Sequence, residues 1–176
     1  KEGLPYKPEV EDMCDAVVVL CITQDLKNIY TTSQWRPCSD SDELGLVAGK
    51  MDKEGACHRQ IAIEEIEEEI RISRQDILSM TYCGVGFSSS GMCTEKVHRY
   101  IAIINGKAIE DDNLQKASDT DFIKRELMPF NFETYSKMTS NTSQMLMNYA
   151  SNILLGQPIF QKIGVMGGTF SPCTSQ

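Results

Sequence analysis

One uninterrupted apolar run near the start of the chain limits the folds that are open to it. The run is "DAVVVLCIT", residues 15–23, in which every residue between the first and the last is hydrophobic. Such a segment is typical of a strand buried on both faces, because neither set of alternating side chains tolerates water. A sheet that is covered on both faces needs a layer of helices on each side. The run therefore predicts an α/β fold.

The rest of the chain supplies the other strands and two helices. Strand patterns cover residues 29–35, 44–49, 76–87, 96–104 and 122–130, and helical periodicity covers residues 59–71 and 131–155. The first two strands flank the short turn "QDLKN" and are expected to pair as an antiparallel hairpin. Residues 36–43 are interpreted as a polar loop. The order β-β-β-α-β-β-β-α predicts a mixed β-sheet between helices.

The length of the chain fits a single domain. Its 176 residues are 41% hydrophobic and 24% charged, which are globular values that allow a full core. We expect residues 1–12 to form a polar N-terminal lead-in and residues 13–160 to form the domain. Residues 161–176 are expected to be a loose C-terminal tail.

Charge and cysteine usage narrow the functional classes. The net charge of -8 disfavours partners such as nucleic acid or anionic membranes, which reward clustered Lys and Arg. No apolar run approaches the ~18–20 residues of a membrane span, so none is expected. The seven cysteines form no C-x-x-C pair and are interpreted as reduced thiols. This cysteine usage predicts a cytoplasmic protein.

The segment "IEEIEEEI", residues 63–70, carries five glutamates on the predicted first helix. Four pairs of these glutamates are three or four residues apart, and together they oppose the helix by roughly 1–2 kcal/mol. At 100° per residue, Glu65, Glu68 and Glu69 share a stripe beside the apolar face. A hard divalent cation such as Mg²⁺ prefers oxygen ligands of this kind and would offset the repulsion. The alternative is an acidic helix face that only contacts solvent.

The segment "LVAGKMDKEGACHRQIAIEEIEEEIRI" resembles the Nudix box, G-x5-E-x7-R-E-U-x-E-E-x-G-U, in which U is a bulky aliphatic residue. Gly49 takes the place of the leading glycine, and the loop that follows is one residue longer than the strict motif. The segments "SQWRP" and "TYCGVGFSSSG" look like the flanking motifs of the UDP-sugar and ADP-ribose pyrophosphatases. The resemblance covers roughly residues 12–160. It implies a Nudix-type α/β/α sandwich with a mixed β-sheet.

The resemblance also implies a reaction and the residues that perform it. The reaction would be Mg²⁺-dependent hydrolysis of the pyrophosphate bond of a nucleoside diphosphate-sugar, such as UDP-glucose or ADP-ribose, and Mn²⁺ is a possible substitute for Mg²⁺. The related enzymes often complete their specificity pockets with a dimer partner, so we expect a homodimer. The residues that the resemblance assigns are Ala48, Glu65, Glu68 and Glu69 to the metal, Glu68 and Asp121 to catalysis with Asp119 as second choice, and Arg36, Ser89 and Gly91 to the substrate.

Three positions depart from the box. Glu64 replaces its arginine, Gly55 or Ala56 stands where its first glutamate is expected, and Arg71 replaces its glycine. If Arg71 must be left-handed, it costs on the order of 1 kcal/mol; otherwise the helix ends in another way. The departures leave a second function open, in which the domain has lost turnover and serves as a ligand-binding or protein-interaction scaffold. A third interpretation is an unrelated acidic α/β protein with a chance likeness to the box.

Overall fold

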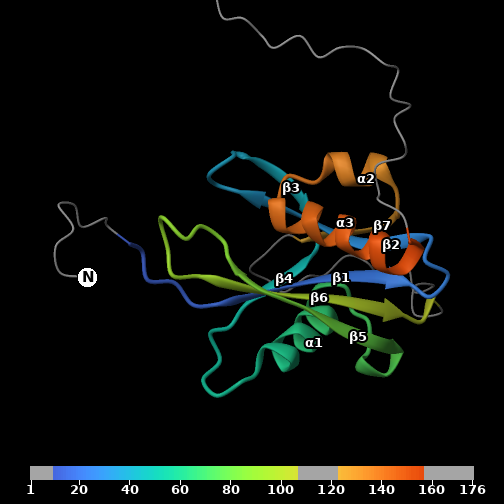
Figure 1. The fold of residues 1–176 in the computed structure, drawn as a ribbon, viewed down its shortest axis with the longest axis horizontal. Helices are drawn as coiled ribbons and strands as arrows, with labels where there is room; N and C mark the ends of the chain where they lie inside the picture. Colours follow the sequence, from blue (N-terminus) through green and yellow to red (C-terminus); the bar gives the residue numbers. More distant parts are fainter. Residues whose placement is uncertain (1–9, 107–122, 157–176) are drawn as a thin grey trace, which may run out of the picture.

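The computed structural model describes residues 10–106 and 123–156 of the chain. Its centre is a seven-stranded sheet with the strand order β3-β2-β1-β6-β5, to which β4 adds beside β1 and β7 adds beside β2 (Figure 1). The strands are β1 (Ala16–Thr23), β2 (Asn28–Arg36), β3 (Ser41–Gly45), β4 (Val47–Lys50), β5 (Ile77–Phe87), β6 (Lys96–Ile104) and β7 (Lys124–Pro129). The helices are α1 (His58–Glu69), the short 3-10 turn η1 (Arg74–Asp76), α2 (Phe132–Lys137) and α3 (Asn141–Leu155).

The sheet is mixed, as the sequence predicts. Strand β1 pairs with β6 in parallel along its whole length, from Ala16 opposite Val97 to Thr23 opposite Ile104. It pairs antiparallel with β2 and with β4, and its pairing with β2 confirms the expected hairpin. The α/β fold with a mixed sheet between helices is therefore confirmed.

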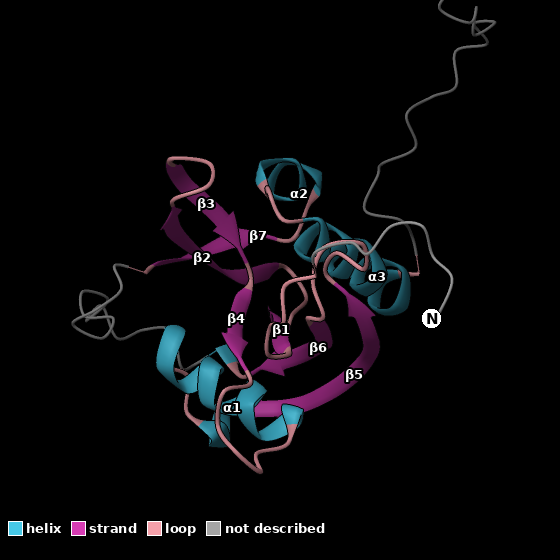
Figure 2. Ribbon diagram, turned by 90° about the vertical axis from the view of Figure 1, so that its left-hand side faces the viewer, coloured by secondary structure: helices cyan, strands magenta, loops and turns pink. Residues whose placement is uncertain are grey.

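The two faces of the sheet are covered by different helices. Helix α1 packs on one face, and α2 and α3 pack on the other (Figures 1 and 2). Alternate residues of β1 supply both halves of the core, because Val17 and Val19 join the cluster under α1 while Leu20 and Ile22 join the cluster under α3. These four side chains are fully buried, which explains why the run in β1 is apolar throughout.

Two predicted segments are divided in the structure. The segment 36–43 is not all loop, because β2 continues to Arg36 and β3 begins at Ser41 directly opposite it. The predicted strand 44–49 is split at the buried Leu46, so that its first part belongs to β3 and its second part to β4. The two parts pair with different neighbours, β2 and β1. Pairing across the sheet, which local sequence does not encode, decides this split.

The predicted helix over residues 131–155 is also two helices. Helix α2 ends at Lys137, and α3 starts only after Ser140, whose hydroxyl accepts a hydrogen bond from the backbone N–H of Ser143. The connecting Met138 has extended backbone and is 2% exposed, packed in the core cluster under α3. Burial of Met138 and the serine cap therefore interrupt a segment whose apolar periodicity is continuous.

Arg71 ends helix α1 in the left-handed conformation, with φ at +54°. Of the two possibilities that the sequence left open, the strained one is found. The last helical hydrogen bond runs from the Ile70 N–H to the Ile66 carbonyl at 3.3 Å. Among the described residues, no helix has the length and apolar character needed to cross a membrane.

Candidate metal and substrate cleft

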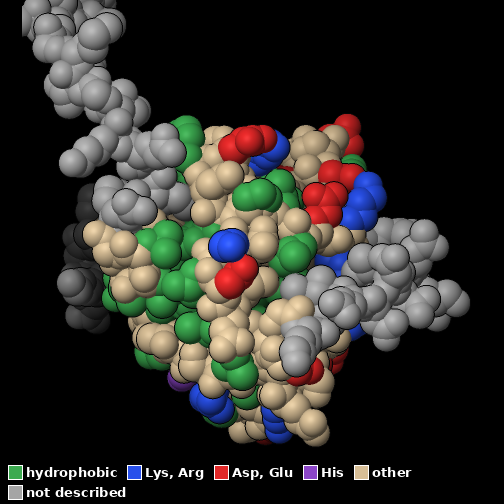
Figure 3. Space-filling model, turned by 90° about the vertical axis from the view of Figure 1, so that its right-hand side faces the viewer, with side chains coloured by type: hydrophobic (Ala, Val, Ile, Leu, Met, Phe, Trp, Pro, Cys, Tyr) green, Lys and Arg blue, Asp and Glu red, His purple; other side chains and the backbone are tan. Residues whose placement is uncertain are grey.

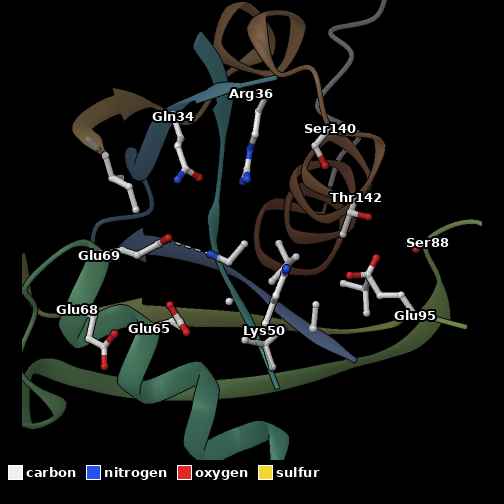
Figure 4. A pocket seen from close by; sticks show the side chains of 17 residues that line it. Gln34, Arg36, Lys50, Glu65, Glu68, Glu69, Ser88, Glu95, Ser140 and Thr142 are labelled. Atoms are coloured by element: carbon white, nitrogen blue, oxygen red, sulfur yellow. Dashed lines mark hydrogen bonds between the residues drawn. The ribbon is translucent and has the colours of Figure 1, made fainter. Parts of the chain in front are cut away.

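A cleft of about 920 Å³ lies between the glutamate side of α1 and the opposite wall formed by the end of β2 and the start of α3 (Figure 4). Its floor is made by the first residues of β1 and by Ala48 and Gly49 on β4. The polar and charged side chains that line it are Gln34, Arg36, Lys50, Glu65, Glu68, Glu69, Ser88, Glu95, Ser140 and Thr142. All three glutamates that the sequence assigns to a metal thus reach one cleft.

Glu69 is the most tightly held of these carboxylates. Its Oε2 accepts a hydrogen bond from the backbone N–H of Ala48 at 3.1 Å, drawn as a dashed line in Figure 4. Burial raises the pKa of Glu69 to about 8, and the neighbouring charge of Glu65 adds to the rise. The Ala48 hydrogen bond and the charge of Arg36 lower this pKa, but they do not offset the burial. A positive charge at the floor of the cleft would therefore stabilise the ionised carboxylate of Glu69.

Glu65 occupies space that only a glycine leaves open. A Cβ atom on Gly49 would lie 1.9 Å from Glu65 Oε1 and 2.0 Å from its Cδ, so any larger residue would displace the carboxylate. Burial is the main cause that raises the pKa of Glu65 to about 7, and the charge of Glu68 is the second cause that raises it. Gly49 thus acts as a cradle that lets a half-buried carboxylate approach the backbone of β4.

Glu68 differs from the other two because it is exposed. Its side chain has 67% of its surface accessible and lies 3.9 Å from Lys53 Nζ. In Figure 4 it points away from the Ala48 amide that holds Glu69. Across residues 10–106 and 123–156, no three His, Cys, Asp or Glu side chains are grouped closely enough to form a ready-made metal centre. The glutamates line a common cleft without converging on one point.

The donor set still fits a hard divalent cation. The charge of Glu65 raises the pKa of Glu69, and the charge of Glu68 raises the pKa of Glu65, and a bound cation would relieve both repulsions. Glu65 and Glu69 both present carboxylate oxygens, which Mg²⁺ and Mn²⁺ prefer over nitrogen or sulfur. Ala48, the predicted backbone ligand, also lines the cleft. The residues present therefore match the cation that the sequence predicts.

The opposite wall of the cleft carries positive charge and hydroxyl groups. Gln34 and Arg36 alternate on β2 and point into the cleft, and Ser140 and Thr142 lie at the start of α3 (Figure 4). Arg36 is close enough to lower the pKa of Glu69. A chance likeness to the box gives no reason for an arginine to face the glutamates in this way.

The other predicted residues have mixed outcomes. Ser88 lines the cleft, whereas Ser89 and Gly91 are not among its lining residues. The Ser89 carbonyl accepts hydrogen bonds from Met92 and Cys93, and Gly91 has open space around it. Local turn geometry thus directs the middle of this loop away from the cleft. Asp121, predicted as catalytic, and Asp119 lie outside the described residues.

Sequence reasoning missed five of the polar and charged lining residues: Gln34, Lys50, Glu95, Ser140 and Thr142. Gln34 could have been identified from period-two alternation, because it shares a strand face with Arg36. Lys50 and Glu95 come from segments that are far apart in the sequence and meet only through the sheet. Ser140 reaches the cleft because the predicted C-terminal helix is interrupted before it.

Comparison with known proteins gives a likeness of fold. The crystal structure of an ADP compounds hydrolase matches with a TM-score of 0.59 and 16% sequence identity, over 86% of this chain and 76% of the other. No family model matches the sequence. No curated protein matches it either. The comparison therefore shows a likeness of fold alone.

Proposed function

We propose that this chain hydrolyses the pyrophosphate bond of a nucleoside diphosphate-sugar, such as UDP-glucose or ADP-ribose, in a Mg²⁺-dependent reaction. The products would be a nucleoside monophosphate and a sugar phosphate. The observation that carries the proposal is one cleft in which Glu65 and Glu69 face Arg36. The fold shared with an ADP compounds hydrolase and the resemblance to the Nudix box support it.

The two walls of the cleft are suited to binding a diphosphate, because one could hold a cation and the other could contact a phosphate group. Glu65 and Glu69 would hold the cation, with Glu68 and the Ala48 carbonyl as further ligands. When bound, Mg²⁺ polarises a phosphoryl oxygen and lowers the pKa of an attacking water. Arg36 would bind a phosphate from the other wall, bidentately where its planar fork allows. The substrate would thus bridge an acidic and a basic wall.

Glu68 and Asp121 remain the proposed catalytic groups. Glu68 is exposed at the rim of the cleft, so its carboxylate is accessible to accept a proton from water. Ser88 replaces Ser89 and Gly91 as the proposed substrate contact from its loop, because it lines the cleft. Ser140 and Thr142 offer hydroxyl groups to the sugar or the phosphate.

The scaffold function is a second candidate, and one observation favours it. Glu68 is turned toward Lys53, and the three glutamates diverge instead of meeting at one point. A domain without turnover would keep the cleft for ligand binding and lose the hydrolysis. The metal distinguishes the two functions, because only the enzyme requires a cation at Glu65 and Glu69.

We also propose a cytoplasmic homodimer. Exposed hydrophobic side chains remain on β5 (Leu78, Tyr82, Val85 and Phe87) and along the outer side of α3 (Met145, Tyr149 and Ile153). Figure 3 shows hydrophobic side chains gathered on one face of the molecule. Light scattering on the purified protein would test the oligomeric state, and a monomer at all concentrations would contradict the homodimer.

The decisive experiment measures phosphate-product release from UDP-glucose and ADP-ribose with Mg²⁺ or Mn²⁺. Glu69→Gln should abolish turnover, because it removes a carboxylate from the cation. Glu67→Gln is the matched control on the same helix, since Glu67 lies outside the cleft and its Oε1 accepts a hydrogen bond from the Arg74 N–H at 2.9 Å. Turnover that survives Glu69→Gln would contradict the assignment of Glu69 to the cation. Turnover that is absent from the parent with both substrates and both metals would favour the scaffold function.

A further inference from the structure

One lysine stands beside the glutamate helix and belongs to no wall of the cleft. Helix α1 has no basic residue in its last turn to balance its glutamates. Lys53, in the loop before the helix, places its Nζ 2.7 Å from Glu64 Oε2 and 3.9 Å from Glu68 Oε1. Glu64 also accepts a hydrogen bond from Gln60 Nε2 at 3.0 Å. A cation of the protein itself is thus already held by the acidic side of α1.

The charge of Lys53 acts on other carboxylates besides its nearest partner, Glu64. The Glu64 hydrogen bond is the main cause that raises the pKa of Lys53, and the charges of Glu68 and Glu65 add to it. In return, Lys53 is a charge that lowers the pKa of Glu65. Glu65 and Glu68 both line the cleft. The ammonium therefore acts on the same carboxylates that the proposed function assigns to a divalent cation.

We propose that Lys53 is a built-in counter-ion of helix α1 that competes with a divalent cation for the cleft glutamates. This inference rests on the proposed function, because it concerns the same carboxylates. Without a cation, Lys53 offsets the repulsion among Glu64, Glu65 and Glu68. With a cation present, the two positive charges repel, and Glu68 exchanges Lys53 for the cation. Lys53 thus stabilises the cation-free helix and weakens cation binding.

The competition has a limited range because the lysine is exposed. The Lys53 side chain has 55% of its surface accessible, and salt screens interactions between such groups. At separations of several ångströms in a mostly aqueous medium, one unit charge changes the affinity for a divalent ion by roughly 3–10-fold. The effect must therefore fade at high ionic strength, whereas a purely steric role of Lys53 would not.

The test titrates Mn²⁺ alone into the full chain and follows free Mn²⁺ by electron paramagnetic resonance. Lys53→Met should bind Mn²⁺ roughly 3–10-fold more tightly than the parent at low salt, with the gain shrinking at high salt. Lys53→Arg keeps the charge and should bind like the parent. Lys53→Met combined with Glu64→Gln removes one charge of each sign and should return toward the parent. In the absence of Mn²⁺, Lys53→Met should melt at a lower temperature.

The outcomes separate this inference from the proposed function. Equal or weaker Mn²⁺ binding by Lys53→Met would overturn the competition while leaving the parent's turnover intact. A gain in affinity that does not respond to salt would overturn it as well. If the parent binds no Mn²⁺ at all, both the proposed function and the competition are contradicted.

Discussion

His58 and His98 stack face to face, with ring centroids 4.3 Å apart and an angle of 8° between the ring planes. His58 opens helix α1, and its Nδ1 is hydrogen-bonded to the hydroxyl of the buried Tyr100. His98 Nδ1 is hydrogen-bonded to Tyr82 at 3.1 Å, and its Nε2 lies 3.7 Å from Asp15. The cluster ties the start of the glutamate helix to strands β5 and β6. Its stability depends on whether the His98 imidazole is charged.

Acid should loosen this cluster. Burial, followed by the charge of His58, lowers the pKa of His98 below its usual 6.5, although Asp15 acts in the opposite direction. At this one side chain the unfolded chain therefore binds more protons than the folded protein just below pH 6.5, so the contribution of His98 to stability is lost as the pH falls through that value, opposite in sign to the contribution of Glu65 and Glu69. His98→Phe keeps a ring for stacking and should lack this contribution, so the stability of the parent relative to the variant should fall with falling pH. Urea unfolding of both proteins across this pH range measures the difference, and parallel curves would contradict it.

Gly49→Ala should damage the site more than the fold. The new Cβ would collide with the end of the flexible Glu65 side chain, which can move aside at small cost to stability. The displaced carboxylate should weaken Mn²⁺ binding and lower kcat/KM by about 10–100-fold. Gly91→Ala is the matched control, because a Cβ there meets nothing within 4 Å. Equal losses of kcat/KM in both variants, or a normal Mn²⁺ affinity in Gly49→Ala, would argue against this role of Gly49 in placing Glu65.

The cation-free protein should lose stability as the pH rises. The pKa values of Glu65 and Glu69 rise from 4.5 to about 7 and about 8 on folding. Between these values the folded protein binds more protons than the unfolded chain, so the free energy of unfolding falls with increasing pH. Glu69→Gln should flatten this fall, and Mg²⁺ should reverse it near pH 8. Chemical unfolding across this pH range, with chelator and with Mg²⁺, checks both expectations. If the free energy of unfolding falls with pH as steeply in Glu69→Gln as in the parent, the raised pKa of Glu69 is refuted.

Arg36→Ala should weaken substrate use and leave the fold intact. Arg36 is exposed at the end of β2 and faces the cleft, so its loss removes a proposed phosphate contact without opening the core. We expect kcat/KM to fall by about 10–100-fold, with Arg36→Lys restoring only part of it because the planar fork is lost. Lys137→Ala is a control outside the cleft, where it removes only the ion pair with Glu133. Steady-state kinetics on the three variants measures the effect.

Most elements could be predicted because their patterns are local. The apolar run in β1 and the isoleucine spacing of α1 reflect the faces that these elements bury. The break at Met138 could not be predicted, since it depends on a core contact with α3. Likewise, helical spacing places Glu65 and Glu69 on one side of α1, but their raised pKa values come from burial against β4. The stacking of His58 on His98 arises from residues on different elements, which no local pattern connects.

The parallel pairing of β1 with β6 has a consequence for how the chain reaches this structure. Ala16 and Val97 are partners across the sheet, and the whole segment between them forms the loop that this pairing closes. Contacts of such long sequence separation slow folding, because the loop entropy is lost before the contact forms. Until β6 arrives, the most apolar strand of the protein has an open edge. During synthesis, the segment from β1 to β5 therefore emerges with its central strand incomplete, and aggregation at that stage competes with folding.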